Sequence, residues 1–290
     1  MKSGFVPVVG RPNVGKSTLI NALVGTKVTI TSERPQTTRN VIRGVVHRPD
    51  LQVVLVDTPG VHRPRTALGK RLNERVVTSL ADADAVVFVI DATAPIGPGD
   101  RLIAGRLLEA STPTVCAVNK VDVASPADIT LQLAEASEWD FEAYVPISAV
   151  EEQNLDPIIS ELERLLPDGP QYFPEDMTSD QSEVFLIGEI VREKFLARLK
   201  QELPHSLAVV VDDLEVGEDG ITRVQARLLV ERDSQKGIVI GKGGSVLKAS
   251  GTAARLELET LLGTKVHLDL RVKVEKDWQQ RPGVIERLGM

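Results

Sequence analysis

Residues 10–17 bring two glycines, a lysine and a serine into the spacing GxxxxGKS, between an apolar run and a helix-like segment. Glycines let successive backbone N–H groups point at a phosphate, and the N-terminus of the following helix favours negative charge. Lys16 would bring a positive charge to the β- and γ-phosphates of a nucleotide, and the Ser17 hydroxyl is a ligand for Mg²⁺. The alternative is a glycine turn that caps an ordinary helix. The residues expected to bind the phosphates are Gly10, Arg11, Pro12, Asn13, Val14, Gly15, Lys16, Ser17 and Thr18.

A second group of polar residues follows the apolar run 114–118 and predicts which base the nucleotide carries. The pattern is NKxD, with Asn119, Lys120 and Asp122. The Asp122 carboxylate can accept hydrogen bonds from N1–H and the exocyclic amine of guanine, a pair of donors that adenine lacks. Ser148 and Ala149 follow the apolar run 143–147, where a backbone N–H is expected to reach guanine O6. Alone, this pair is equally compatible with the start of a helix.

Two further segments are expected to sense Mg²⁺ and the terminal phosphate. The first closes the apolar run 51–56 and consists of Asp57, Thr58, Pro59 and Gly60. Asp57 can hold Mg²⁺ through water, and the Gly60 N–H can bond the γ-phosphate. In the polar loop after the first helix, Thr38 is predicted to complete the Mg²⁺ shell, with Thr37 as the alternative. The predicted metal ligands are Ser17, Thr38 and Asp57, and the predicted catalytic residues are Lys16, Thr38 and Gly60.

These motifs follow apolar runs that recur along the first half of the chain. Strand-like runs are expected at 5–9, 40–47, 51–57, 85–91, 114–119 and 143–147, and helix-like segments at 16–24, 68–80, 99–110, 126–137 and 154–166. Strands that alternate with helices predict an α/β fold with a doubly wound, mixed but mostly parallel sheet, whose ligand loops gather at the carboxyl ends of the strands. Pro7 lies in the first strand and lacks an N–H, so we expect a locally altered ladder there.

The composition is that of a soluble chain with two domains. At 290 residues the chain is long for one domain, and charges interrupt every apolar run well short of a membrane span. The single cysteine, Cys116, is expected to be a core residue in a reducing compartment. The histidines lack the spacing of metal ligands, so nucleotide-bound Mg²⁺ is the only metal expected. The net charge of −7 arises in residues 1–180, so bulk charge does not argue for nucleic-acid binding by the remainder.

The second half of the chain has a different order of elements. Residues 168–180 are rich in proline, glycine and acids without periodicity, which predicts a linker between a domain at 1–167 and a domain at 181–290. The second domain reads as helix, two strands, two helices and a strand, an order typical of an α+β type II KH fold. Trp278 is expected to cap the core of this domain, with base stacking as the alternative.

The pattern GxxG occurs twice in this domain, and charge separates the two copies. Gly217–Gly220 contains two acids and joins two strands, so it reads as a turn that would repel phosphate. Gly241–Gly244 contains Lys242 and opens a helix, which lets a nucleic-acid backbone come close. The alternative is a glycine-rich corner between helices. The predicted RNA-binding residues are Lys236, Ile240, Gly241, Lys242, Gly243, Gly244 and Lys248, over an apolar floor to which Ile238, Val239 and Leu247 also contribute.

The motifs across residues 10–149 resemble the small GTPase domain of the translation-factor-related class. Together with the linker, including Phe173–Asp176, the run 234–244 and the ending 278–290, they make the whole chain similar to the Era family of ribosome-assembly GTPases. The resemblance implies GTP and GDP as ligands with Mg²⁺, and binding of small-subunit (16S) ribosomal RNA near its 3′ end in 30S subunit assembly. It also implies a cytoplasmic protein, with part of the pool at the inner face of the cell membrane. We expect a monomer that binds the ribosomal subunit and no DNA.

Val61 stands where Ras-like enzymes carry a glutamine that orients the attacking water. Without that group we expect slow hydrolysis, about 10⁻⁴ to 10⁻² per second, until a partner, a potassium ion or RNA assists. Three nearby arginines are expected to be solvated: Arg39, Arg63 and Arg65. The alternative function is a GTP-dependent signalling switch whose second domain binds protein. A third reading, an ATPase, predicts no preference for guanine.

Overall fold

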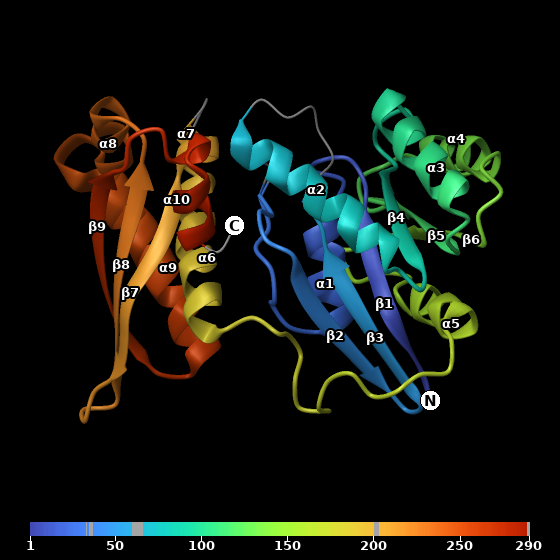
Figure 1. The fold of residues 1–290 in the computed structure, drawn as a ribbon, viewed down its shortest axis with the longest axis horizontal. Helices are drawn as coiled ribbons and strands as arrows, with labels where there is room; N and C mark the ends of the chain where they lie inside the picture. Colours follow the sequence, from blue (N-terminus) through green and yellow to red (C-terminus); the bar gives the residue numbers. More distant parts are fainter. Residues whose placement is uncertain (33, 35–36, 60–65, 200–202, 289–290) are drawn as a thin grey trace. The chain divides into compact units, whose positions relative to one another are not determined.

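The apolar runs of the first half form one sheet in the computed structural model. The structure describes residues 1–32, 34, 37–59, 66–199 and 203–288. Contacts divide the chain into two units, of which the first ends at Asp180 and the second consists mainly, but not only, of the residues from Gln181 onward. In the first unit the described strands lie in the order β2-β3-β1-β4-β5-β6 (Figure 1). Their bounds are β1 Lys2–Val9, β2 Ile42–Arg48, β3 Leu51–Asp57, β4 Val86–Asp91, β5 Thr114–Asn119 and β6 Ala143–Ile147. Only β2 is antiparallel to its neighbour, so the predicted mixed, mostly parallel sheet is confirmed.

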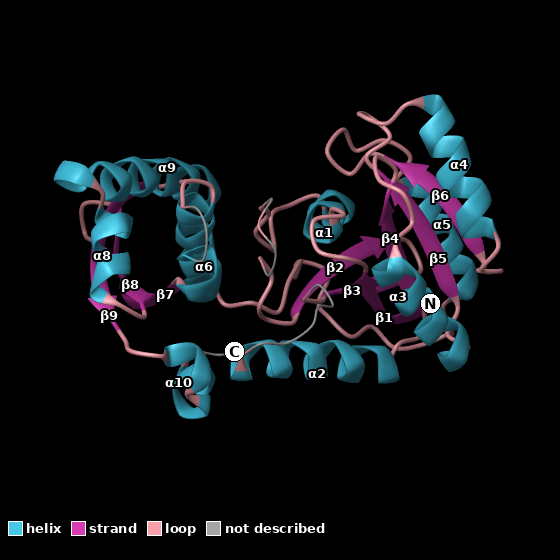
Figure 2. Ribbon diagram, turned by 90° about the horizontal axis from the view of Figure 1, so that it is seen from above, coloured by secondary structure: helices cyan, strands magenta, loops and turns pink. Residues whose placement is uncertain are grey.

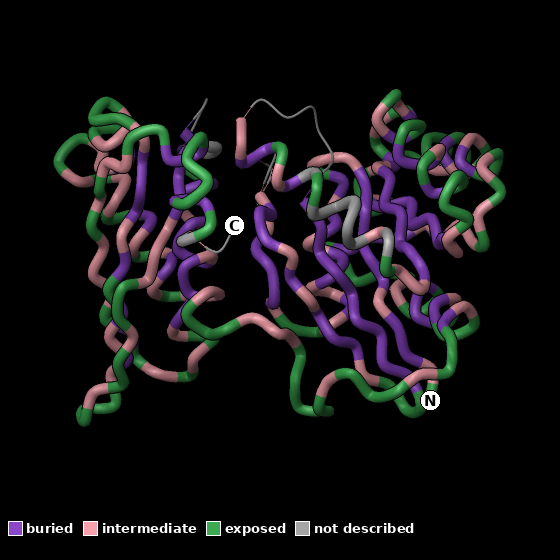
Figure 3. Tube along the Cα trace, viewed as in Figure 1, coloured by how far each residue is buried: buried purple, intermediate pink, exposed green. Residues whose placement is uncertain are grey.

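Helices cover both faces of this sheet (Figure 2). Their bounds are α1 Lys16–Val24, α2 Ala67–Ala81, α3 Pro98–Ala110, α4 Pro126–Ser137 and α5 Asp156–Leu165. Leu19 of α1 and Leu162 of α5 share one buried cluster with the strands, whereas Ile103 of α3 and Ala136 of α4 share another with Phe88. Because the strands are covered on both sides, they read as continuous apolar runs, and Figure 3 shows them buried along most of their length.

Two residues singled out in the sequence lie inside the sheet. Pro7 pairs in register with β3, but the β1–β4 ladder begins only at Val8. On that side the N–H of Phe5 donates instead to the carboxylate of Asp84, at 2.7 Å. The predicted local change of the ladder is therefore confirmed. Cys116 is a free, fully buried thiol whose burial raises its pKa, as expected of a core residue.

Residues 168–180, all of which the structure describes, form no helix or strand but pack along the first unit (Figure 1). The buried side chain of Gln52 donates to the Phe173 carbonyl at 2.8 Å and accepts from the Phe173 N–H at 3.0 Å. At the end of the segment, the Asp180 carboxylate accepts hydrogen bonds from the backbone and the guanidinium of Arg43 on β2. Residues 168–180 therefore lack regular structure, as their composition predicts, but they are bound to the sheet by specific hydrogen bonds.

The second unit has an α+β fold whose main elements follow the predicted order. Its helices are α6 Glu183–Leu196, α7 Leu203–Ser206, α8 Asp233–Ile240, α9 Ser245–Leu262 and α10 Pro282–Arg287, and its strands are β7 Ala208–Val216, β8 Ile221–Val230 and β9 Lys265–Val274. The sheet order is β7-β8-β9, with β7 antiparallel and β9 parallel to β8. Phe195 of α6 and Leu258 of α9 pack in one core with Leu228 of β8. The predicted α+β KH fold is confirmed, with two additional short helices, α7 before β7 and α10 after β9.

Trp278 follows β9 and closes the core of the second unit. Its side chain is fully buried, and Nε1 donates to the Ser206 carbonyl at 2.9 Å. The expected core role is therefore confirmed. In the part of the chain that the structure describes, no helix has both the length and the apolar character needed to cross a bilayer.

Candidate functional site

The GxxxxGKS residues form a tight turn between β1 and α1. Gly10, Asn13 and Gly15 have positive φ angles of 154°, 66° and 101°, a region that favours glycine and tolerates asparagine. A Cβ at Gly15 would overlap the side-chain amide of Asn119, so only glycine fits there. Because α1 begins at Lys16, the unpaired N–H groups of its first turn border the loop. The same turn contains Arg11, Pro12 and Val14, whereas the predicted residues Ser17 and Thr18 lie in the first turn of α1.

Lys16 is held inside this turn as a buried cation. Its ammonium donates to the carbonyl of Gly10 at 3.1 Å and to that of Arg11 at 2.8 Å. Burial lowers the pKa of Lys16 to about 8, although the neighbouring Asp57 acts in the opposite direction. An anion placed at the loop would therefore stabilise the protonated lysine and gain a strong charge-assisted contact.

Three hydroxyl groups converge on one carboxylate oxygen at the end of β3. Oδ2 of Asp57 accepts from Ser17 at 2.8 Å and from Thr38 at 3.1 Å, and the two hydroxyl oxygens lie 3.0 Å apart. The third donor is Thr29, at 2.8 Å, which no motif had indicated. Burial raises the pKa of Asp57, opposed by these hydrogen bonds and by the charge of Lys16. The sequence-predicted metal ligands are therefore brought together.

These groups fit Mg²⁺, which prefers oxygen ligands. Oδ1 of Asp57 is buried and has no hydrogen-bond partner among the described residues, an arrangement that is costly unless a cation or water occupies the position. The Thr37 hydroxyl instead donates to the Arg34 carbonyl at 2.6 Å, so Thr38 lies at the site and Thr37 does not. The described ranges contain no cluster of three His, Cys, Asp or Glu residues. A metal at this position would depend on Ser17, Thr38 and one carboxylate.

Asn119 links the phosphate loop to the loop after β6. Its amide nitrogen donates to the Val14 carbonyl at 2.8 Å, and its amide oxygen accepts from the Ala149 N–H at 3.0 Å. The side chain is almost fully buried. Because both functional groups of the amide are used, Asn119 holds the two loops at a set separation. The phosphate loop and the predicted base-binding loop therefore form one site.

Asp122, three residues after Asn119, is exposed to solvent, so its carboxylate is accessible to a base. One of its oxygens accepts from the Ser148 hydroxyl at 2.7 Å, which orients the carboxylate. The N–H groups of Ser148 and Ala149 donate to Gln153 and Asn119, respectively. The predicted backbone donor to guanine O6 is thus already engaged in this structure. These two residues shape the loop and orient Asp122.

Two acidic residues outside the motifs form ion pairs with basic residues of the motifs. Asp91, at the end of β4, pairs with Lys120 at 2.6 Å. Burial would raise the pKa of Asp91, but hydrogen bonds from Lys120 and Thr93 lower it overall. Asp100, fully buried in the first turn of α3, pairs with Arg11 at 2.8 Å. Asp91 ends an apolar run, a signal that sequence reasoning had available, whereas nothing local marks Asp100 as a partner of the phosphate loop.

Part of the segment that begins at Asp57 lies outside the described residues. Thr58 and Pro59 follow β3 and are buried, and the Thr58 hydroxyl donates to the Val8 carbonyl at 2.8 Å. Gly60, predicted to bond the γ-phosphate, is not among the described residues. The same holds for Val61, Arg63 and Arg65. Arg39 is described and is 2% exposed, so the prediction that it is solvated is wrong.

The second GxxG copy forms a turn that opens toward solvent between α8 and α9. Gly241, Gly243 and Gly244 have φ angles of 76°, 59° and 78°, which non-glycine residues rarely adopt. A Cβ at Gly241 would lie 2.8 Å from the backbone nitrogen of Val246, whereas Gly243 and Gly244 border open space. The first copy, at 217–220, is the predicted strand turn.

Side chains around this turn differ in how far they reach solvent. Lys242 and Lys248 are exposed, and Lys236 and Ile240 are half-buried. Val239 is fully buried in the core, so its predicted place in an apolar floor is wrong, because its side of α8 packs against the sheet. The helix N-terminus and the lysines give the turn a positive local field.

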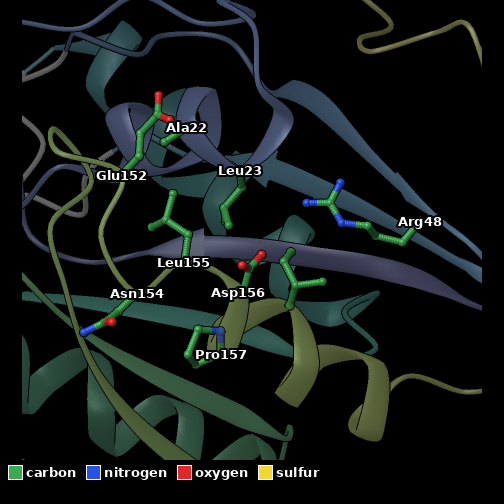
Figure 4. A pocket seen from close by; sticks show the side chains of 9 residues that line it. Ala22, Leu23, Arg48, Glu152, Asn154, Leu155, Asp156 and Pro157 are labelled. Atoms are coloured by element: carbon green, nitrogen blue, oxygen red, sulfur yellow. The ribbon is translucent and has the colours of Figure 1, made fainter.

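A pocket of about 360 Å³ lies elsewhere in the first unit (Figure 4). It opens between the end of α1, the end of β2 and the start of α5. Leu23, Arg48, Glu152 and Asp156 line it, and the residues of the predicted motifs do not. Its position therefore separates it from the nucleotide motifs.

A phosphate loop, a base-recognition loop and a hydroxyl–carboxylate site at the carboxyl ends of a doubly wound sheet define a P-loop GTPase, here combined with a KH unit. The family model described as 50S ribosome-binding GTPase matches residues 5–120, and the KH domain model matches 202–279. GTPase Era of Mycobacterium avium (strain 104) and that of Mycobacterium tuberculosis (strain ATCC 25618 / H37Rv) are each 53% identical over 99% of this chain and 98% of their own. The chain belongs to the Era family of GTPases.

Two solved structures are similar to the whole chain. One is a variant of Aquifex aeolicus Era bound to GDP·AlF₄⁻, and the other is an Era in complex with MgGDPNP and nucleotides 1506–1542 of 16S ribosomal RNA. Each has a TM-score of 0.94 and 38% sequence identity, and each comparison covers 100% of this chain and 99% of the other. Both units of this chain therefore have counterparts in solved members of the family.

Proposed function

We propose that this GTPase binds Mg²⁺·GTP, hydrolyses it slowly, and uses the GTP-bound state to hold small-subunit ribosomal RNA near its 3′ end during 30S subunit assembly. The observation that carries the proposal is the convergence of Ser17, Thr38 and Asp57, because it ties the loop after α1 to the phosphate loop. The related Era that contains MgGDPNP together with 16S ribosomal RNA nucleotides supports the combination of ligands. We also propose that the protein is a monomer that associates with ribosomal subunits in the cytoplasm, with part of the pool peripheral on the cytoplasmic face of the cell membrane.

Each part of the first unit has a distinct task in this proposal. Lys16 binds the β- and γ-phosphates in place of its two carbonyl partners. Asp122 reads the guanine edge, and Asn119 holds its loop against the phosphate loop. Bound Mg²⁺ would supply a positive charge that neutralises the phosphate oxygens. Gly60 is proposed to sense the γ-phosphate, so that loss of this group releases the loops on either side.

The second unit is proposed to bind RNA through the turn 241–244. Lys242 and Lys248 are exposed there, and two of the glycines border open space, as an approaching sugar–phosphate backbone requires. A protein-binding signalling switch would need no such opening, so the geometry favours RNA. Residues 1–167 would thus bind and hydrolyse GTP, residues 181–290 would bind RNA, and residues 168–180 would link the two domains.

RNA affinity measured in both nucleotide states tests the coupling between the two domains. We expect one protein preparation to bind an RNA of the 3′ end of 16S ribosomal RNA at least about tenfold more tightly with a GTP analogue than with GDP, a coupling of the usual size. Fluorescence anisotropy provides the measurement, and a shuffled RNA of equal length is the control. Equal affinities in the two states would remove the proposed coupling.

Raising the pH from 7 to 8.5 is expected to weaken GDP binding about fourfold, because Lys16 loses its proton in the free protein. The pKa of Lys16 is lowered to about 8 by burial, whereas bound phosphates favour the protonated form. Binding therefore takes up a proton above pH 8, and affinity is nearly constant well below that pH. Titration with GDP checks this, and guanosine, which lacks phosphates, controls for ionisation of the base. A constant GDP affinity over this range contradicts the assignment.

A further inference from the structure

We infer that Thr29 is a positioning residue for Mg²⁺ binding: its hydroxyl orients the Asp57 carboxylate so that one oxygen stays available for the hydrated metal ion. Thr29 lies outside every motif recognised in the sequence. The inference rests on the proposed use of Mg²⁺·GTP and GDP by this site. It concerns how the site is built, not which ligand it takes.

The hydrogen bonds at Asp57 set Thr29 apart from the other two hydroxyl residues. Ser17 and Thr38 are themselves the proposed metal ligands, so their oxygens serve the metal as well as the carboxylate. Thr29 donates to Oδ2 of Asp57 at 2.8 Å and is 1% exposed. It is therefore the one of the three donors whose task is confined to holding the carboxylate.

A side chain of α1 holds Thr29 in place. The amide oxygen of Asn21 accepts from the N–H groups of Val28 and Thr29, at 2.9 and 3.0 Å, and its amide nitrogen donates to the Thr29 carbonyl at 2.8 Å. Asn21 follows Ser17 by four residues, so the two lie on the same face of the helix. One helix thus positions two of the hydroxyls that reach Asp57.

The hydrogen bond from Thr29 helps to distinguish the two oxygens of the Asp57 carboxylate. With Oδ2 engaged by three hydroxyls, Oδ1 is the oxygen left without a partner among the described residues. A partial rotation of the carboxylate about its Cβ–Cγ bond would move the accepting oxygen away from all three hydroxyls and turn the second oxygen out of its position. In the proposed GDP state Thr38 is released. Ser17 and Thr29 are then the two hydroxyl residues that still donate to the Asp57 carboxylate. Thr29 should therefore matter most for Mg²⁺ bound with GDP.

The test measures how Mg²⁺ slows the dissociation of a fluorescent GDP analogue from the full-length protein. Replacing Thr29 with valine keeps the shape of the side chain and removes the hydroxyl. We expect the Mg²⁺ concentration that gives the half-maximal effect to rise about tenfold, the effect of losing one hydrogen bond to a charged group. Dissociation in EDTA should stay within about twofold of wild type, because the contacts to base and phosphate are unchanged.

Two further variants separate positioning from a general packing effect. Thr29→Ser retains the hydroxyl and should restore the Mg²⁺ dependence. Thr114→Val removes a hydroxyl that is equally buried but donates to the Thr112 carbonyl, and should behave as wild type. An unchanged midpoint in Thr29→Val overturns the inference. Faster dissociation in EDTA and in Mg²⁺ by the same factor also overturns it, because that result indicates a structural role only.

A third variant serves if Thr29→Val does not fold. Asn21→Ala releases the segment that presents Thr29, and its midpoint should rise in the same direction. A wild-type midpoint in this variant counts against the inference. Failure of the inference is distinguishable from failure of the proposed function, since the latter would appear as absent guanine-nucleotide binding in the wild-type protein.

Discussion

Replacing Asp122 with alanine is expected to raise the dissociation constant of GDP by about 10² to 10⁴, because two hydrogen bonds between a carboxylate and the guanine edge are lost at about 1.5–3 kcal/mol each. The Ser148 hydroxyl holds the carboxylate in place before the base arrives, so little ordering is needed on binding. Affinity for ADP should stay weak and unchanged. Calorimetric titration of both nucleotides measures the effect.

Inosine diphosphate isolates one of the two hydrogen bonds at Asp122, because hypoxanthine retains N1–H and lacks the exocyclic amine. The wild-type protein should prefer GDP over IDP by about tenfold or more, and Asp122→Ala should bind both equally. Asp128→Ala removes an exposed carboxylate in the first turn of α4 and serves as the matched control. A variant at Asp122 that still distinguished the two nucleotides would contradict the assigned role.

Replacing Lys242 with aspartate is expected to weaken binding of the 16S ribosomal RNA 3′ end by at least about tenfold, because it reverses the charge where the RNA backbone must approach. Lys242 is exposed, and it lies between Gly241 and Gly243 in the turn. The salt dependence of the binding constant should fall by about one unit of slope. Nucleotide affinity should not change, because the substitution lies in the other unit.

Lys265→Asp is the matched control for Lys242→Asp. The Lys265 side chain is 80% exposed. Lys265 follows the C-terminus of α9, whereas the GxxG turn precedes the N-terminus of the same helix. The same charge reversal at that position should leave RNA affinity within about twofold of wild type, apart from the small long-range effect of net charge. RNA binding weakened equally by both variants would indicate a diffuse electrostatic effect and would count against a site at the turn.

The order of elements was predictable because its signals are local. Apolar runs of strand length, a proline at the first position of α4 and glycines at the ends of α1 and α9 each act within a few residues. The same applies to the turn at 10–17, whose positive φ angles require residues of the types found there. The short helices α7 and α10 were not predicted. The packed course of 168–180 was not predicted either, because Gln52 and Arg43, which bind it, lie more than a hundred residues earlier.

The motifs of the candidate site were predictable from the sequence. The residues outside the motifs that hold the motif side chains in place were not. Ser17, Thr38 and Asp57 could be paired in advance because each stands at a recognisable position. Thr29 and Asp100 could not, since a threonine in a loop and an aspartate in a first helical turn are common and carry no mark of their partners. Arg39 was expected to be solvated, and the burial of its side chain contradicts that expectation.

Patterns among near neighbours in the amino-acid sequence were enough to predict the nucleotide loops, their preference for guanine and most of the succession of strands and helices. Tertiary structure alone decided which hydroxyls reach Asp57, which acids hold Arg11 and Lys120, and which lysines face solvent beside Gly241. The physical reason is distance along the chain. Backbone conformation and capping depend on near neighbours, whereas hydrogen bonds and burial between remote residues exist only once packing has brought their elements together.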